Sequence, residues 1–110
     1  MNKEEILLKV EEIANYIKET EEYKKYLKSL DNLNKNQELL SIIENIKKYQ
    51  QEIVKDKNKE EELDKKIKKN LDILNNNPIY LEYLNYQDEV NNMIIIFENK
   101  LNKYFSDIFN

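Results

Sequence analysis

PIYLEYLNYQDEVNNMIIIFENKLNKYFSDIF, residues 78–109, is the stretch that decides the fold. Apolar side chains recur in it every three or four residues, which is the spacing of one face of an α-helix. That face comprises Ile79, Tyr83, Tyr86, Val90, Ile94, Phe97, Leu101, Phe105 and Ile108. Asn77-Pro78 marks its start, because Asn caps helix N-termini and Pro fits the first helical position. The pattern predicts one helix over 78–109.

The middle of this helix is apolar on every side. Five successive apolar residues at 93–97 point in all directions around a helix axis. At ~1.5 Å per residue the helix would span about 48 Å, whereas a compact domain of this size has a radius of gyration of about 13 Å. We therefore expect the helix to kink or to be covered by a second chain. The predicted oligomer or partner interface comprises Tyr83, Tyr86, Val90, Met93, Ile94, Ile95, Ile96, Phe97 and Leu101.

The remaining sequence also shows helical periodicity. Apolar spacings of three and four residues predict further helices at about 2–18, 21–30, 36–55 and 60–75. Thr20 is the expected N-cap of the second helix, and the polar segment 31–37 is expected to be a loop. Segment 55–62, which is almost entirely charged, is expected to be either a loop or a solvated helix end. Together these elements predict an all-α fold, a single domain over 1–110 built as a bundle of about five helices with a long C-terminal helix.

The composition excludes several kinds of chemistry. The chain has no Gly, Cys, His, Arg or Trp and only one Pro. Without Cys and His there is no usual zinc site, no thiolate nucleophile and no Ser-His-Asp triad. Without Gly there is no Walker loop or dinucleotide-binding fingerprint. Adjacent acidic residues point about 100° apart on a helix, so they indicate solvated faces. We expect no catalytic residue, no metal site, no cofactor and hence no enzyme.

Charge and hydropathy favour neither nucleic acid nor membrane as a partner. The chain carries 22 acidic and 18 basic residues, for a net charge of −4. Its one basic patch is in segment 64–70, beside the acidic residues 60–62, so direct RNA contact is not expected. The patch comprises Lys65, Lys66, Lys68 and Lys69. The longest apolar run, 93–97, is far shorter than the roughly 20 residues that span a bilayer. With no signal peptide at the start, we expect a cytoplasmic protein.

The order of these segments resembles a known family. The helix bearing Ile6, Ala14 and Ile17 is followed by TEEYKKY at 20–26, which is similar to that family's Ser-x-Glu-Tyr-x-x-Tyr segment. A long helix reaching Tyr49-Gln50, a charged helix and the NNPI sequence at 76–79 come next. Tyr83, Asp88 and Glu89 then follow, as in the family's Asn-Pro, aromatic and acidic positions. The chain thus resembles the YlbF/YmcA family of small helical regulators in Firmicutes and relatives, over nearly its whole length.

The resemblance implies a YheA/YmcA-like helical protein that self-associates and has no enzymatic activity. Family members are linked to competence, sporulation and biofilm formation, and some direct an endoribonuclease in mRNA maturation. Some of those complexes carry flavin and cysteine-ligated iron–sulfur clusters. This chain has no Cys, so the clusters are not carried over.

The resulting expectation is a regulatory adaptor that works through helix–helix contacts. Its expected partners are a second copy of itself, paralogous family members or a ribonuclease complex. The residues leave two alternatives open. One is a structural helical self-assembly module without a regulatory role, and the other is a weak RNA-binding accessory protein that uses the 65–69 lysine patch.

Overall fold

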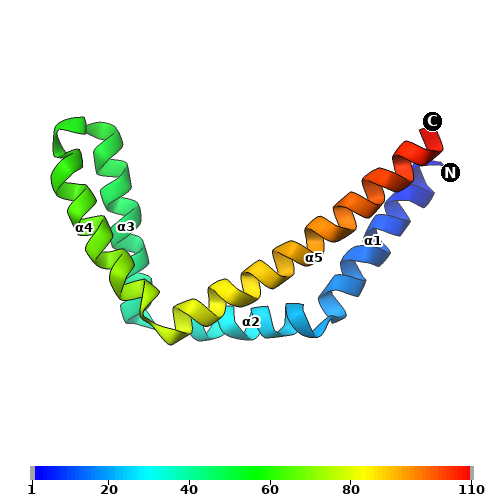
Figure 1. Ribbon diagram of the computed structural model, residues 1–110. Coiled ribbons are helices and arrows are strands. Elements are labelled where there is room, and N and C mark those ends of the chain that lie inside the picture. Colours follow the sequence, from blue (N-terminus) through cyan, green and yellow to red (C-terminus); the bar gives the residue numbers. More distant parts are fainter. Residues whose placement is uncertain (1, 110) are drawn as a thin grey trace. The chain divides into compact units, whose positions relative to one another are not determined.

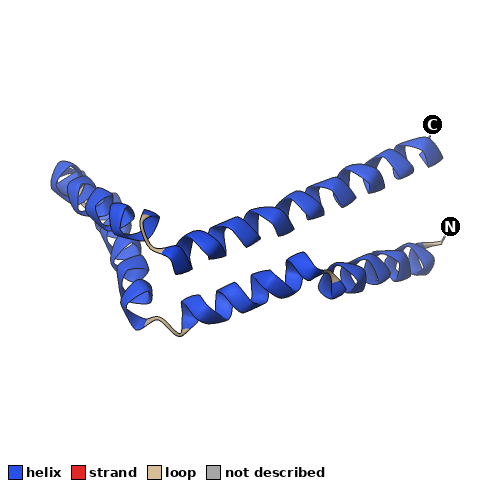
Figure 2. Cartoon of the chain, turned by 60° about the horizontal axis from the view of Figure 1, so that its bottom comes forward, coloured by secondary structure: helices blue, strands red, loops and turns tan. Residues whose placement is uncertain are grey.

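The computed structural model describes residues 2–109, and within them every regular element is a helix (Figure 2). Figure 1 labels α1 to α5, and a short 3₁₀ helix, Lys57–Lys59, lies between α3 and α4. The predicted all-α fold with a long C-terminal helix is confirmed. The five α-helices are Lys3–Glu19, Glu21–Asn34, Gln37–Lys55, Glu60–Asn75 and Pro78–Phe109.

One predicted boundary is wrong. The polar composition of segment 31–37 predicts a loop, but α2 continues to Asn34. Leu33 extends the apolar face of the helix and is 5% exposed, so burial favours the extra turn. The Asp31 carboxylate and the Lys35 ammonium form an ion pair of 2.8 Å, one helical turn apart. Burial of a single Leu therefore outweighs the turn propensity of an Asn-rich segment.

Polar side chains cap the starts of α2, α3 and α5, and the caps predicted at Thr20 and Asn77 are confirmed. The Thr20 hydroxyl accepts a hydrogen bond from the Tyr23 N–H at 3.3 Å. The Asn77 side-chain oxygen accepts one from the Ile79 N–H at 2.9 Å, and Asn36 caps α3 in the same way. No residue among 2–109 has a positive φ. These helix boundaries thus rest on polar side chains rather than on left-handed turns.

The chain packs as two compact units. Unit 1 contains the chain up to Lys28 and again from Asn85 onward, and unit 2 is Ser29–Leu84. Helices α2 and α5 therefore contribute residues to both units. The expectation of one domain over 1–110 stays a prediction.

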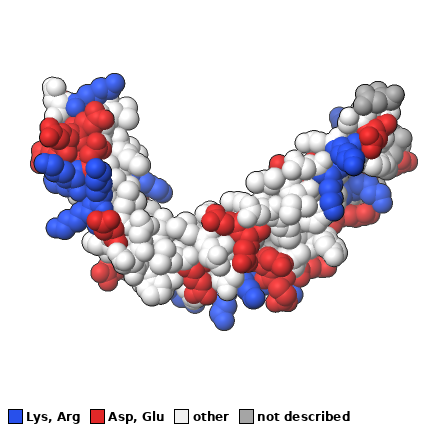
Figure 3. Space-filling view, in the orientation of Figure 1, with Lys and Arg blue, Asp and Glu red and all other residues white. Residues whose placement is uncertain are grey.

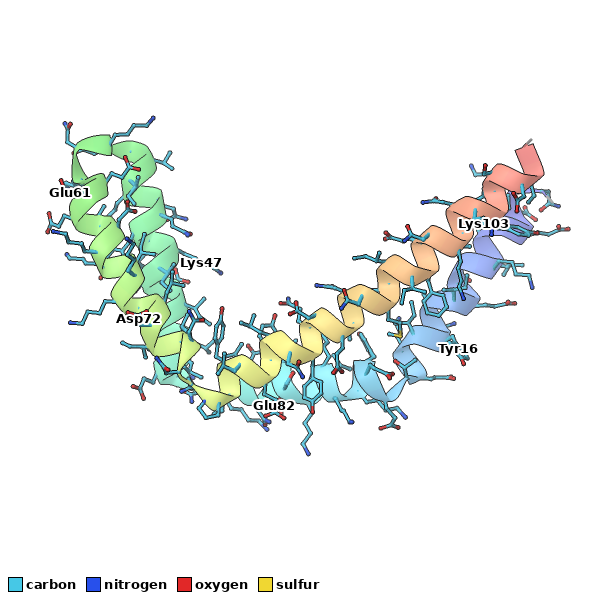
Figure 4. The ribbon with its side chains drawn as sticks, viewed as in Figure 1. Tyr16, Lys47, Glu61, Asp72, Glu82 and Lys103 are labelled. Atoms are coloured by element: carbon cyan, nitrogen blue, oxygen red, sulfur yellow. The ribbon has the colours of Figure 1, made fainter. Side chains whose placement is uncertain are left out.

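Unit 2 is built on the α3–α4 hairpin (Figure 1). Its core is a cluster of three buried leucines, Leu33, Leu39 and Leu74. Half-buried side chains from α3 and the start of α5 pack around this cluster: Ile42, Ile43, Ile46, Ile79, Tyr80 and Tyr83. The charged side chains labelled on α4 in Figure 4, Glu61 and Asp72, are exposed. Unit 2 thus has a conventional dry core and a charged exterior.

Unit 1 is much more open. Helix α1 runs alongside the C-terminal part of α5 in the opposite direction, as both ribbon views show (Figures 1 and 2). Helix α1 has no fully buried residue. Among the described residues of unit 1, Val90 is the only buried apolar side chain, at 6% exposure. The two helices therefore bury only part of their apolar faces against each other.

Candidate protein-contact surface

Large apolar side chains remain exposed on all three helices that contribute to unit 1, α1, α2 and α5. On α5, Ile95 is 51% exposed and Ile96 is 55% exposed. Other exposed apolar residues of unit 1 are Leu7, Leu8, Val10, Tyr16, Leu27, Tyr104 and Ile108. Single exposed apolar residues are ordinary, but so many in one small helical unit typically mark a protein interaction site.

An open groove of about 530 Å³ lies along one side of α5. Its lining combines three apolar side chains, Met93, Ile96 and Phe97, with four polar ones. Glu22 belongs to α2, and Lys100 follows Glu89 by eleven residues along α5. We call this feature the α5 groove; it is lined by Glu22, Glu89, Asn92, Met93, Ile96, Phe97 and Lys100.

Phe97 is also part of a second hollow, of about 270 Å³, on the α1 side. There it faces Ile13, Glu12 and Tyr16, and Tyr16 is labelled in Figure 4. Closer to the chain ends, α1 and α5 line a much smaller hollow of about 30 Å³, with Ile6 and Val10 on one side and Leu101 and Phe105 on the other. The space around Phe97 is therefore the larger of these two hollows.

The structure distributes the nine predicted interface residues over different environments. Met93, Ile96 and Phe97 meet in the α5 groove. Tyr83 instead packs against the core of unit 2, and Val90 is buried within unit 1. Ile95 is exposed outside the α5 groove, and the half-buried remainder are Tyr86, Ile94 and Leu101. Whether a partner covers the exposed members stays a prediction.

The predicted interface lacks four groove residues, and all are polar: Glu22, Glu89, Asn92 and Lys100. A signal for two of them is present in the sequence. Glu89, Met93, Ile96 and Lys100 have spacings of four, three and four, so they share one helix face. Nothing in the sequence pattern indicates that Glu22, on another helix, joins them. Apolar periodicity alone does not reveal the charged residues of this groove.

The lysine patch of α4 is partly paired. Figure 3 shows lysine and acidic side chains together on the α3–α4 hairpin. The Lys66 ammonium lies 3.9 Å from a Glu62 carboxylate oxygen and 5.7 Å from the centre of the Tyr49 ring. Both contacts lie within unit 2. Both involve Lys66, one of the four lysines that could bind an RNA phosphate. The patch is therefore a mixed-charge surface rather than a basic one.

Within residues 2–109, no three acidic side chains converge as a metal ion would require. The described helices also include none with the length and hydropathy needed to cross a bilayer.

Comparison with protein families identifies one match. The family described as "Control of competence regulator ComK, YlbF/YmcA" matches residues 6–106, which run from the first turn of α1 to near the end of α5. Among curated proteins, none matches the chain significantly. The family match covers nearly the whole chain and agrees with the helical fold, so the chain belongs to the YlbF/YmcA family of competence-control proteins.

Proposed function

We propose that this protein is a non-enzymatic regulatory adaptor that acts on competence by binding other proteins through the helix faces of unit 1. The family assignment supports a regulatory role. The observation that carries the proposal is the α5 groove, lined by both apolar and charged side chains, in a unit that leaves many apolar side chains in water. Covering such a surface with a partner helix lowers the free energy, because apolar side chains leave the water.

The chemistry of the residues supports the non-enzymatic part of the proposal. The chain offers no Cys or His for nucleophilic or acid–base work near neutral pH. The polar residues of the α5 groove are carboxylates, an amide and an ammonium, held on an open surface. In an open groove, charges interact about as weakly as they do in bulk water, because the solvent screens them, whereas a closed active site strengthens such interactions. Contact with a partner is the function that this geometry supports.

The proposed partners are a second copy of this chain, paralogous family members and a ribonuclease complex, with sporulation, biofilm formation and mRNA processing as further outputs of the same contacts. The rival function is a self-assembly module without a regulatory role. Deleting the gene in its native host separates the two functions, because only the loss of a regulator changes the expression of other genes.

The test is a deletion in the native host that carries a reporter of ComK activity. We expect the deletion to change reporter output and wild-type protein to restore it. Ile96→Asp, which places a charge among the apolar side chains of the α5 groove, should fail to restore it. Ile73→Asp is the matched control, because Ile73 is 45% exposed on α4 and lies outside the groove. Unchanged reporter output after deletion would refute the regulatory role.

A further inference from the structure

We infer that helix α1 is a strap, which opens away from α5 as a unit about Thr20 and, when closed, conceals apolar surface beside the α5 groove. This inference rests on the proposed function, because it adds regulation to the proposed contact surface. Three observations carry it: the shallow packing of α1, the way in which its ends are capped, and the position of Phe97 between the groove and α1.

The packing of α1 is shallow along its whole length. Only Ile6, Ile13 and Ile17 are half-buried, and every other residue of Lys3–Glu19 is exposed. Segments with few buried apolar contacts open locally at a lower cost in free energy than global unfolding. Unit 2 differs, because its core contains a cluster of buried leucines. We therefore expect α1 to open while unit 2 stays folded.

The caps of α1 do not depend on α5. At the start of the helix, the Asn2 side-chain oxygen accepts a hydrogen bond from the Glu5 N–H at 2.9 Å. At its end, the Thr20 hydroxyl donates to the Ile17 carbonyl at 2.6 Å, and the Thr20 N–H donates to the same carbonyl at 3.1 Å. Helix α1 can therefore leave α5 without losing any of these hydrogen bonds.

Thr20 has the geometry of a hinge. It is the single residue between α1 and α2, and its backbone is extended, with φ of −70° and ψ of 151°. Its hydroxyl also accepts a hydrogen bond from the Tyr23 N–H in the first turn of α2. One side chain thus caps the helices on both sides of the break, so rotation at this residue can reorient α1 and leave both helices intact.

Phe97 links α1 to the α5 groove. It lines the groove and also the larger hollow, where Ile13 and Tyr16 of α1 lie. Further along α5, Leu101 and Phe105 line the smaller hollow and are half-buried. Opening of α1 would therefore uncover three apolar side chains that continue the surface of the groove. A partner helix would cover more apolar area on the open state and would bind that state more tightly.

The experiment is native-state hydrogen exchange of the full chain, measured by mass spectrometry at low concentrations of urea. Opening of a strap exposes little new surface, so the central α1 amides should exchange at least about ten-fold faster than α3 amides and with little dependence on urea. The amides of α5 from 90 to 105 should remain slower than those of α1. A urea dependence of α1 as steep as that of α3, or equal rates for α1 and this part of α5, would overturn the inference.

Two pairs of variants locate the contact that holds the strap closed. Ile13→Ala should speed exchange of α1 about ten-fold, because it removes packing against α5 while Ala favours the helix itself. Leu8→Ala is its matched control, since Leu8 is 58% exposed on α1 and lines neither hollow. Phe97→Ala should act as Ile13→Ala does, whereas Ile96→Ala, in the groove but outside the larger hollow, should not. Equal effects within either pair would refute this contact.

The ComK reporter measures whether the closed strap conceals the functional surface. With expression graded in the deletion strain, Ile13→Ala protein should restore the reporter at a lower level than wild type, because more of it is open. Leu8→Ala protein should need the wild-type level. An equal or higher requirement for the Ile13→Ala protein would overturn the concealing role of α1.

Failure of this inference is distinguishable from failure of the proposed function. Hydrogen exchange of the purified protein detects a fixed α1 whether or not the protein regulates ComK, and a fixed α1 leaves the regulatory role standing. A strap that opens in a protein whose deletion leaves the reporter unchanged does the reverse.

Discussion

Leu39 of α3 and Leu74 of α4 lie in the same cluster and are the most deeply buried large side chains of the described residues, at 1% and 2% exposure. They join the two helices of the hairpin near its open end. Unit 1 has no comparable pair, since its one buried apolar side chain among the described residues is Val90. Unit 2 therefore supplies the dry core, and unit 1 supplies the accessible apolar surface.

Leu74→Ala should lower the free energy of unfolding by about 2–5 kcal/mol, because it deletes buried methyl groups and leaves a cavity. Denaturant unfolding followed by circular dichroism measures the loss. The matched control is Ile73→Ala, at a neighbouring residue that is 45% exposed and should change stability by no more than about 0.5 kcal/mol. Equal losses for the two variants would contradict the assignment of the core.

Asn77→Ala should destabilise the protein by about 1 kcal/mol, because the side chain caps the start of α5. Its oxygen accepts hydrogen bonds from the Ile79 N–H at 2.9 Å and the Tyr80 N–H at 3.4 Å. Asn85→Ala is the control, since Asn85 is exposed within α5 and Ala is the better helix former. Thermal melts of both variants should therefore move in opposite directions, and a common direction would argue against the cap.

Ile95 and Ile96 provide an internal test of the interface. They are similarly exposed, but only Ile96 lines the α5 groove. Ile96→Asp should abolish the ability of the protein to restore the ComK reporter, since it puts a carboxylate among the apolar side chains of the α5 groove, whereas Ile95→Asp should leave that ability intact. Reporter output in the complemented deletion strain measures the difference. Loss of restoration with both variants would mean that a partner covers α5 on more than one side.

Lys65, Lys66, Lys68 and Lys69 should not bind RNA measurably near physiological salt. Lys66 is engaged with Glu62 and Tyr49, and acidic residues flank the patch. Gel-shift titrations of the wild type and of the variant with all four lysines changed to Glu should look alike. A wild-type shift that weakens steeply with salt and disappears in the variant would instead support the RNA-binding alternative.

Much of the fold can be predicted from local features of the sequence, namely the spacing of apolar residues and the residues that cap helices. The three- and four-residue spacings along α3 and α5 and the Asn77-Pro78 boundary each identify an element without reference to the rest of the chain. The end of α2 differs, because Asn32, Asn34 and Asn36 favour a turn locally. The burial of Leu33 in the cluster of unit 2 decides otherwise, and that contact exists only in the folded chain.

Some residues of the contact surface can likewise be predicted from the sequence, and others cannot. Apolar periodicity identifies Met93, Ile96 and Phe97, which meet in the α5 groove. It does not separate them from Tyr83, whose burial in unit 2 depends on how α5 begins beside the α3–α4 hairpin. Nor can it place Glu22 in the same groove as Glu89, since that requires two helices distant in sequence to come together.

The exposed apolar surface of unit 1 makes the ratio of this chain to its partners important. A copy without a partner keeps Ile95, Ile96 and the other exposed apolar side chains in water, and such surfaces favour non-specific association. Raising the expression of this chain without raising that of its partners would therefore increase aggregation rather than activity.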